Sequence, residues 1–409
     1  MEHTRRAMLR AGALLLGTSL VAACSADPTT STTAQQAAGG GRTAKIYVIS
    51  PQSGPDAALG LGMRNSAQLA VEQAKARGDI PGWTLEVVPL DDAGDPTKAA
   101  EAAKKAAADE ATVAVVGSIF SGLTKAMQQP LSDAGILLVS PSATNPTLSR
   151  GEDYAKKPKR QYDSFFRVIA PDDAHAPALA QHLRSQNTGR VAVVHDGDSY
   201  GSGLASAFTE AFEKEGGKVV TSAQIDPKAP LVYTKVVDQL VKAKPQAVLF
   251  GGVEIQGGAL ARQIREAGLT VPVVGGDALA TELYIPKSGP VSGGDLSTAS
   301  GAPVDTVEAG KAYLAAYRDH RFRESATSYG PLGYDAASAA LAALTTALPS
   351  ATSPEAARKA AVSAMSSVKI DGTSGPVAFD EFGDVTPRSV TVNVLRAGAW
   401  TPAKTYSFG

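Results

Sequence analysis

The segment "VAVVGSIFSGLTKAMQQPLSDAGILLVSPSATNP", residues 113–146, contains the pattern that decides the fold. Two short apolar runs, 113–118 and 136–140, are separated by a stretch with the hydrophobic period of an α-helix. Continuous apolar strands that alternate with helices are typical of a parallel sheet with helices on both faces. This segment therefore predicts one strand–helix–strand unit of an α/β fold.

The same alternation continues on both sides of this segment and forms two series, which are joined at "SFFRVIAPDD", residues 164–173. We therefore expect two lobes, each built on a doubly wound parallel sheet, with a hinge of several chain segments between them. The predicted strands are 45–50, 84–92, 113–118 and 136–140 in the first series, and 190–196, 218–226, 247–252 and 271–277 in the second.

The chain has 409 residues, 44% of them hydrophobic, which is enough for two domains with sizeable cores. The order of the two series predicts how the chain is divided between them. The predicted parts are a signal peptide at 1–23, a lipidated cysteine and flexible tether at 24–42, the first lobe at 43–168 and 303–372, and the second lobe at 169–302 and 373–409.

The N-terminal stretch "TRRAMLRAGALLLGTSLVAAC", residues 4–24, has the features of an export signal. The pair Arg5 and Arg6 before a short apolar run resembles a twin-arginine signal, and "VAAC" resembles a bacterial lipobox. Cys24 is the only cysteine in the chain, so it has no disulfide partner within it. We therefore expect a lipid on Cys24 that anchors the mature protein to the outer face of the cell membrane. The alternative is a chance cysteine in a plain secretory signal.

Composition and motifs argue against several classes of function. The 39 basic and 40 acidic residues nearly balance, so no nucleic-acid partner is expected. The stretch "YGSGLAS", residues 200–206, departs from the dinucleotide-binding fingerprint at Ser206. Asp91 and Asp92 could suggest a metal ion, but a turn followed by a helix cap at Asp95 is the favoured interpretation. We expect no cofactor, no metal and no enzymatic activity.

Small polar or acidic residues follow several of the predicted strands. In open α/β sheets, ligands bind at the carboxyl ends of the strands. Ser121, Ser142 and Thr144 would supply hydroxyl groups to one wall of a cleft. Tyr200 and Asp277 would supply an aromatic ring and a carboxylate to the other wall. Such a set suits a zwitterion, because hydroxyls and helix N-termini hold a carboxylate while a buried acid holds an ammonium. Each residue could also be an ordinary turn, cap or packing residue.

Three stretches together resemble the periplasmic branched-chain amino-acid-binding proteins of ABC transporters, which are type I solute-binding proteins. They are "GSIFSGLTKAMQQPLSDAGILLVSPSATNP" at 117–146, "AVVHDGDSYGSGLA" at 192–205 and "VPVVGGDA" at 271–278. The resemblance covers nearly all of residues 45–400. It implies an extracytoplasmic binding protein that closes its cleft around an amino acid.

The resemblance also implies roles for individual residues. Ser121 and Thr144 look like the hydroxyls that hold the ligand carboxylate, and the backbone carbonyl of Ser142 looks like an acceptor for the ammonium. Tyr200 is similar to the tyrosine of the second lobe that closes over the ligand. Asp277 matches an acidic position that pairs with the ammonium.

The chain departs from the family pattern at the side-chain pocket. Leu59 and Val253 stand where the leucine/isoleucine/valine binder has aromatic residues, so a strict preference for branched chains is in doubt. Glu254 could reach a polar group of the ligand or cap its helix, and the cap is the favoured interpretation.

The expected partners are a free amino acid and an ABC permease, and the expected state is a monomer. A sensory ligand-binding protein of the same fold, or a binder of an amide, a urea-like compound or another small solute, is the alternative.

Overall fold

The first sheet lies in the N-terminal half of the chain, in a computed structural model that describes residues 42–289 and 294–408. Its five strands are all parallel and follow the order β2-β1-β3-β4-β5. The strands are β1 (Arg42–Ser50), β2 (Trp83–Asp91), β3 (Thr112–Gly117), β4 (Leu137–Ser140) and β5 (Phe165–Arg167). The parallel sheet expected for the first lobe is confirmed.

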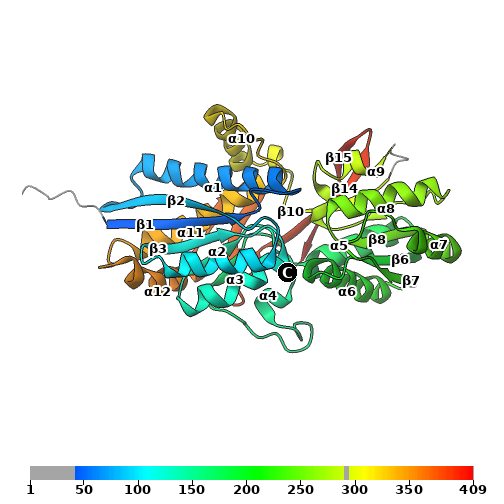
Figure 1. The fold of residues 1–409 in the computed structure, drawn as a ribbon, viewed down its shortest axis with the longest axis horizontal. Coiled ribbons are helices and arrows are strands. Elements are labelled where there is room, and N and C mark those ends of the chain that lie inside the picture. Colours follow the sequence, from blue (N-terminus) through cyan, green and yellow to red (C-terminus); the bar gives the residue numbers. More distant parts are fainter. Residues whose placement is uncertain (1–41, 290–293, 409) are drawn as a thin grey trace, which may run out of the picture. The chain divides into compact units, whose positions relative to one another are not determined.

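Helices cover both faces of this sheet (Figure 1). Side chains alternate along β1, so Ile46 and Val48 pack on one face while Tyr47 and Ile49 pack on the other. The first face carries helices α1 and α11, and the second face carries α2 and α3. The helices grouped with the first sheet are α1 (Ala57–Arg77), α2 (Pro96–Ala108), α3 (Ser121–Asp133), α4 (Thr147–Arg150), α10 (Glu308–His320), α11 (Gly330–Ala347) and α12 (Pro354–Ala364).

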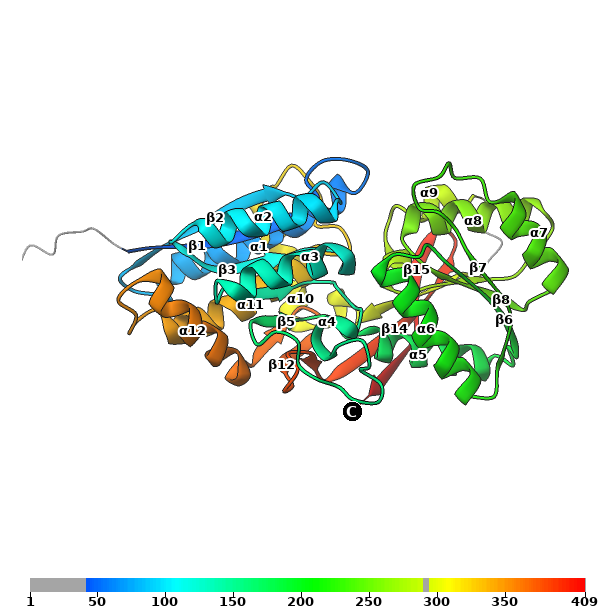
Figure 2. The same cartoon turned by 60° about the horizontal axis from the view of Figure 1, so that its bottom comes forward.

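The second sheet has seven strands in the order β15-β14-β10-β9-β8-β6-β7. Five of them, β6, β7, β8, β14 and β15, are labelled in Figure 2. Helices α5 and α6 pack on one face, and α7 and α8 on the other. The strands are β6 (Arg190–His195), β7 (Lys218–Gln224), β8 (Ala247–Gly251), β9 (Val273–Val274), β10 (Leu296–Ser300), β14 (Arg388–Arg396) and β15 (Ala399–Phe408). The helices are α5 (Asp172–Ser185), α6 (Ser199–Lys214), α7 (Thr234–Ala243), α8 (Glu254–Glu266) and α9 (Ile285–Ser288).

Strands β7, β6, β8, β9 and β10 of the second sheet are parallel, as expected, and two antiparallel strands extend it at one edge. Strand β14 runs antiparallel to β10, and β15 runs antiparallel to β14. Only Ala397 and Gly398 separate β14 from β15, and both have positive φ angles, of 48° and 78°. A two-residue connection of this kind joins antiparallel strands, because a parallel pair needs a long crossover.

The chain passes between the two sheets three times. The passages follow β5, follow β10 and precede β14. The second lobe was expected to resume at 373, but only β14 and β15 of that segment join its sheet. Strands β11 (Ile370–Gly372), β12 (Gly375–Phe379) and β13 (Val385–Thr386) form a separate sheet of three strands. The division of the chain into lobes therefore stays a prediction.

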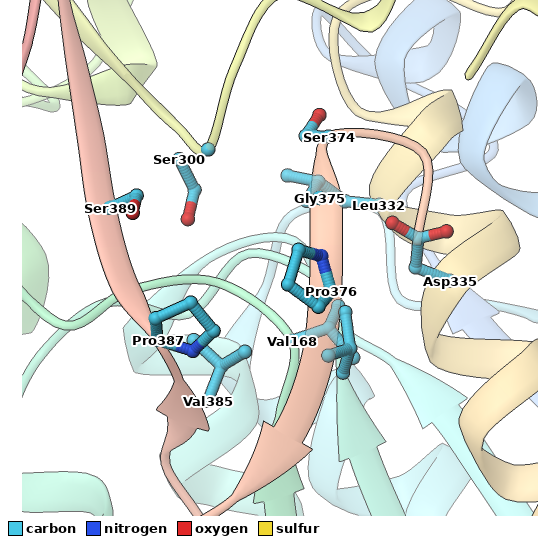
Figure 3. Close-up of a pocket in the computed structure, with 12 residues that line it drawn as sticks. Val168, Ser300, Leu332, Asp335, Ser374, Gly375, Pro376, Val385, Pro387 and Ser389 are labelled. Atoms are coloured by element: carbon cyan, nitrogen blue, oxygen red, sulfur yellow. The ribbon is translucent and has the colours of Figure 1, made fainter. Parts of the chain in front are cut away.

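The three passages meet around a small cavity of about 50 Å³ (Figure 3). Val168, Ser300 and Pro387 line it, one from each passage. Asp335 of α11 also lines it and accepts hydrogen bonds from the backbone N–H and the hydroxyl of Thr373, at 2.9 and 2.8 Å. Helix α11 is thereby joined to the small sheet beside the hinge.

Candidate functional site

The loops after β3 and β4 form one wall of the candidate site. Ser121 is the first residue of α3, and its hydroxyl accepts a hydrogen bond from the Asn145 backbone N–H at 3.2 Å. The Ser142 hydroxyl donates to the Ile119 carbonyl at 2.8 Å. Both serines therefore brace one loop against the other. Thr144, in the same loop as Ser142, is fully buried.

A buried arginine holds the loop after β4 in position. Arg167 on β5 is fully buried and donates to Asp384 at 2.7 Å. It also donates to the carbonyls of Ala143 and Asn145, at 2.9 and 2.8 Å. Its remaining nitrogen donates to the Ser149 hydroxyl at 2.8 Å. The two carbonyls flank Thr144, so one side chain determines where that hydroxyl lies.

The acidic pair at the end of β2 forms a turn and a cap, as favoured from the sequence. Asp91 accepts from the backbone N–H groups of Gln52 and Ala93, at 2.7 and 2.8 Å. Asp92 accepts from the Ser118 hydroxyl at 2.6 Å. Asp95 caps α2. Within residues 42–289 and 294–408, no group of three or more His, Cys, Asp or Glu side chains is arranged to hold a metal ion.

Asp277 is the meeting point of groups from both halves of the chain. It lies just after β9, is 7% exposed and accepts a hydrogen bond from the Tyr200 hydroxyl at 3.4 Å. Its second oxygen accepts from the Tyr329 hydroxyl at 3.1 Å. Burial raises the pKa of Asp277 to about 6, and the two hydroxyls oppose that rise. Tyr200 and Asp277 are therefore brought together, as the sequence predicted.

Tyr329 and Asp172 are members of this site that sequence reasoning missed. Tyr329 lies just before α11, and nothing in its local pattern marks it. Asp172 opens α5 and is fully buried. Burial raises the pKa of Asp172 well above its usual value, Asp277 raises it further, and the Thr144 hydroxyl opposes the rise. Asp172 is therefore near both Thr144 and Asp277, although neither of its carboxylate oxygens has a hydrogen-bond partner.

The two walls also touch directly. The Asn145 side-chain amide donates to the Ser199 carbonyl at 2.5 Å and to its hydroxyl at 3.2 Å. A Cβ atom at Gly203 would approach the Asn145 amide nitrogen to 2.8 Å. Glycine at this position of α6 therefore permits the close approach of α6 to the loop after β4.

The positions expected to line a side-chain pocket have different surroundings. Leu59 is fully buried and packs in the apolar core with Met63. Val253 is half-buried and is the residue that precedes α8. Glu254, the first residue of α8, is fully buried, and neither of its carboxylate oxygens has a hydrogen-bond partner. The helix cap favoured for Glu254 is not formed.

Asp277 and Tyr329 line a cavity of about 110 Å³ on the side of the hinge. Thr298 and Ser300 at the end of β10 line it as well.

The residues expected to be lipidated or to direct export, Cys24, Arg5 and Arg6, lie outside the described residues. In the part of the chain that the structure describes, no helix is long and apolar enough to span a membrane.

Comparison with known proteins shows the same architecture and related sequences. The periplasmic binding protein family matches residues 43–396. Leu/Ile/Val-binding protein homolog 3 of Brucella melitensis is 33% identical over 276 residues, which cover 65% of this chain and 72% of that protein. Leu/Ile/Val-binding protein BraC3 of Rhizobium johnstonii is 29% identical over 354 residues, which cover 86% of this chain and 92% of that protein.

Solved structures agree on the fold. The branched-chain amino acid transporter substrate binding protein LivJ of Streptococcus pneumoniae, in complex with isoleucine, superposes with a TM-score of 0.77 at 23% identity, covering 90% of this chain and 100% of that one. A solute binding protein of R. palustris in complex with benzoate superposes with a TM-score of 0.76 at 19% identity, covering 89% and 96%. The chain belongs to the periplasmic binding protein family, as a type I solute-binding protein of the branched-chain amino acid group and not as an enzyme.

Proposed function

We propose that this protein captures a free α-amino acid between its two lobes and delivers it to an ABC permease, while a lipid on Cys24 anchors it to the outer face of the cell membrane. The observation that carries the proposal is the buried carboxylate of Asp277, which receives hydroxyl groups from Tyr200 and Tyr329. Tyr200 lies on α6, which packs on the second sheet, and Tyr329 lies just before α11, which packs on the first. A buried acid at such a junction is suited to the α-ammonium group of a ligand.

The first wall supplies what an α-carboxylate needs. No side chain caps the N-terminus of α3, where Ser121 is the first residue. The first N–H groups of a helix and its macrodipole attract an anion. The Thr144 hydroxyl lies in the neighbouring loop, held there by Arg167. Together these groups would bind the carboxylate by donors alone, which explains why the loop "SPSATNP", residues 140–146, contains no acid or base.

The second wall supplies the partner for the ammonium. An ammonium beside Asp277 would favour the ionised carboxylate and so reverse the effect of burial on its pKa. Hydrogen bonds to charged groups contribute about 1.5–3 kcal/mol each. A zwitterion therefore gains most when both walls contact it, and this differential contact favours the closed state.

The names of related proteins support an amino acid as the ligand and transport as the purpose. The Brucella and Rhizobium relatives are named as Leu/Ile/Val-binding proteins. The S. pneumoniae structure is that of a transporter substrate binding protein. The closed form with bound amino acid would be the form that the permease recognises.

The test is a calorimetric titration of the full chain, purified in detergent and freed of bound ligand, with a panel of L-amino acids and with benzoate. Asp277→Ala should weaken amino-acid affinity by more than tenfold, because it leaves the ammonium without its carboxylate. Asp238→Ala, an exposed acid on α7, is the matched control and should change nothing. Unchanged affinity in Asp277→Ala, or binding of benzoate but of no amino acid, would contradict the proposal.

A further inference from the structure

Glu254 is a buried acid for which the folded protein provides no partner. Its side chain is 0% exposed, and both carboxylate oxygens lack a hydrogen-bond partner. Most buried polar atoms in proteins are hydrogen-bonded, because burying a polar group without a partner is unfavourable. A group that is left unpaired in this way calls for an explanation.

The groups that face Glu254 make the absence of a partner more costly. The pKa of Glu254 is raised to about 8, mainly by burial; its own backbone N–H opposes the rise, and the carboxylates of Asp56, Glu282 and Asp277 contribute to it. Asp56 precedes α1 in the first lobe, whereas Glu282 and Asp277 belong to the second. Among the ion pairs formed by residues 42–289 and 294–408, none includes any of these four acids. Glu254 therefore lies in an acidic region shared by both lobes.

Three explanations internal to the protein do not account for this carboxyl group. It does not cap α8, because no side chain accepts from the first N–H groups of that helix. No metal-binding arrangement exists among the described residues. Protonation would remove its charge but would leave a hydroxyl donor and a carbonyl acceptor still without partners. The missing partner must then come from outside the chain, as a bound water or as a group of the ligand, and the ligand titrations below separate the two.

Glu254 also has a neighbour in common with Asp277, the acid that the proposed function assigns to the α-ammonium group. Tyr329 lies close enough to both carboxylates that each raises its pKa, with burial as the larger cause. Tyr329 in turn donates to Asp277 at 3.1 Å. Two acids near one tyrosine can bind two positive groups of the same small molecule, and a tyrosine ring favours a cation nearby.

We propose that Glu254 binds a second cationic group of the ligand, so that the amino acid carried by this protein has an amine or guanidine on its side chain. This inference rests on the proposed function, in which Asp277 binds the α-ammonium. Val253, the neighbour of Glu254, is half-buried and leaves the acid as the one charged group at the start of α8. The specificity would then differ from that of the Leu/Ile/Val-binding relatives.

The test compares pairs of ligands that differ only in the side-chain cation. L-Lysine, L-ornithine and L-arginine are titrated into the full chain beside L-norleucine and L-leucine, since norleucine is lysine without its amine. The wild-type chain should bind lysine or arginine at least tenfold more tightly than norleucine. Glu254→Gln should weaken that binding at least tenfold and leave norleucine within about threefold. Glu266→Gln, an exposed acid at the other end of α8, is the control and should behave as wild type.

Proton release gives a second readout that a merely structural role would not produce. Titration at pH 7 in two buffers of different ionisation enthalpy should show that lysine binding releases a proton, because the cation forces Glu254 to ionise. Norleucine should release less, and Glu254→Gln should abolish the difference. Thermal unfolding of each variant confirms that it is folded.

The outcomes separate this inference from the proposed function. If leucine or norleucine binds as tightly as lysine and Glu254→Gln changes neither affinity, the inference is wrong while the amino-acid function stands. If no α-amino acid binds the wild-type chain, the proposed function fails and the inference fails with it.

Discussion

Replacing Arg167 with methionine tests whether one buried side chain determines the position of the binding loop. Arg167 and Asp384 are both 0% exposed, so solvent does not screen their interaction. Removing one partner of a buried ion pair costs about 3–5 kcal/mol. Arg150 lies 3.1 Å from the other oxygen of Asp384 and would partly compensate. We therefore expect the lower end of that range, about 3 kcal/mol, to be lost from the free energy of unfolding.

The assay is urea unfolding followed by circular dichroism for Arg167→Met, Asp384→Asn and the double variant. The double variant should lose less than the sum of the two single losses, by about 1–3 kcal/mol, because neither charge is then left unpaired. Arg167→Met should also weaken ligand affinity, since the carbonyls of Ala143 and Asn145 lose their donor. A loss below 1 kcal/mol in Arg167→Met, or strict additivity in the double variant, would refute the reasoning.

Two further predictions concern pH and the membrane anchor. Burial raises the pKa of Glu254 from 4.5 to about 8 and that of Asp277 from 3.8 to about 6, so the ligand-free folded state holds protons that the unfolded chain releases. The melting temperature of Glu254→Gln should therefore rise relative to that of the wild-type chain as pH increases from about 4.5 to about 8, and a difference that does not change with pH would contradict this. The wild-type chain and Cys24→Ala are expressed in a bacterium that processes lipoproteins. Cys24→Ala should move the protein from the membrane fraction to the soluble exported fraction. Retention of the variant in the membrane fraction would exclude the lipid anchor.

The residues at the strand ends are the part of the site that could be predicted from the sequence pattern. Ser121, Thr144 and Asp277 each follow a predicted apolar strand, and the structure places each of them at such an end. The reason is that the carboxyl ends of parallel strands meet at one edge of a sheet, so a local pattern predicts a shared location. The acidic turn at Asp91 and Asp92 could be predicted for the same reason, because turns and caps depend on neighbouring residues.

The remaining members of the site depend on contacts between distant parts of the chain. Tyr329 meets Asp277 across 52 residues, and Arg167 meets Asp384 across 217. Neither partner carries a local signal, since a tyrosine before a helix or an arginine in a short strand is common in any fold. The segment 373–409 was assigned to the second lobe, whose sheet β14 and β15 join, but their antiparallel direction was not predicted, because a strand pattern does not specify the direction of pairing.

The sequence by itself determined the two α/β series, the parallel first sheet and the polar strand ends, because each of these follows from hydrophobic period or from residues close together in the chain. Only the tertiary structure decided that Asp277 is bound by tyrosines from both halves and that Glu254 is buried without a partner. Burial and long-range pairing are properties of the packed chain. They depend on which surfaces meet, and a single sequence does not record that.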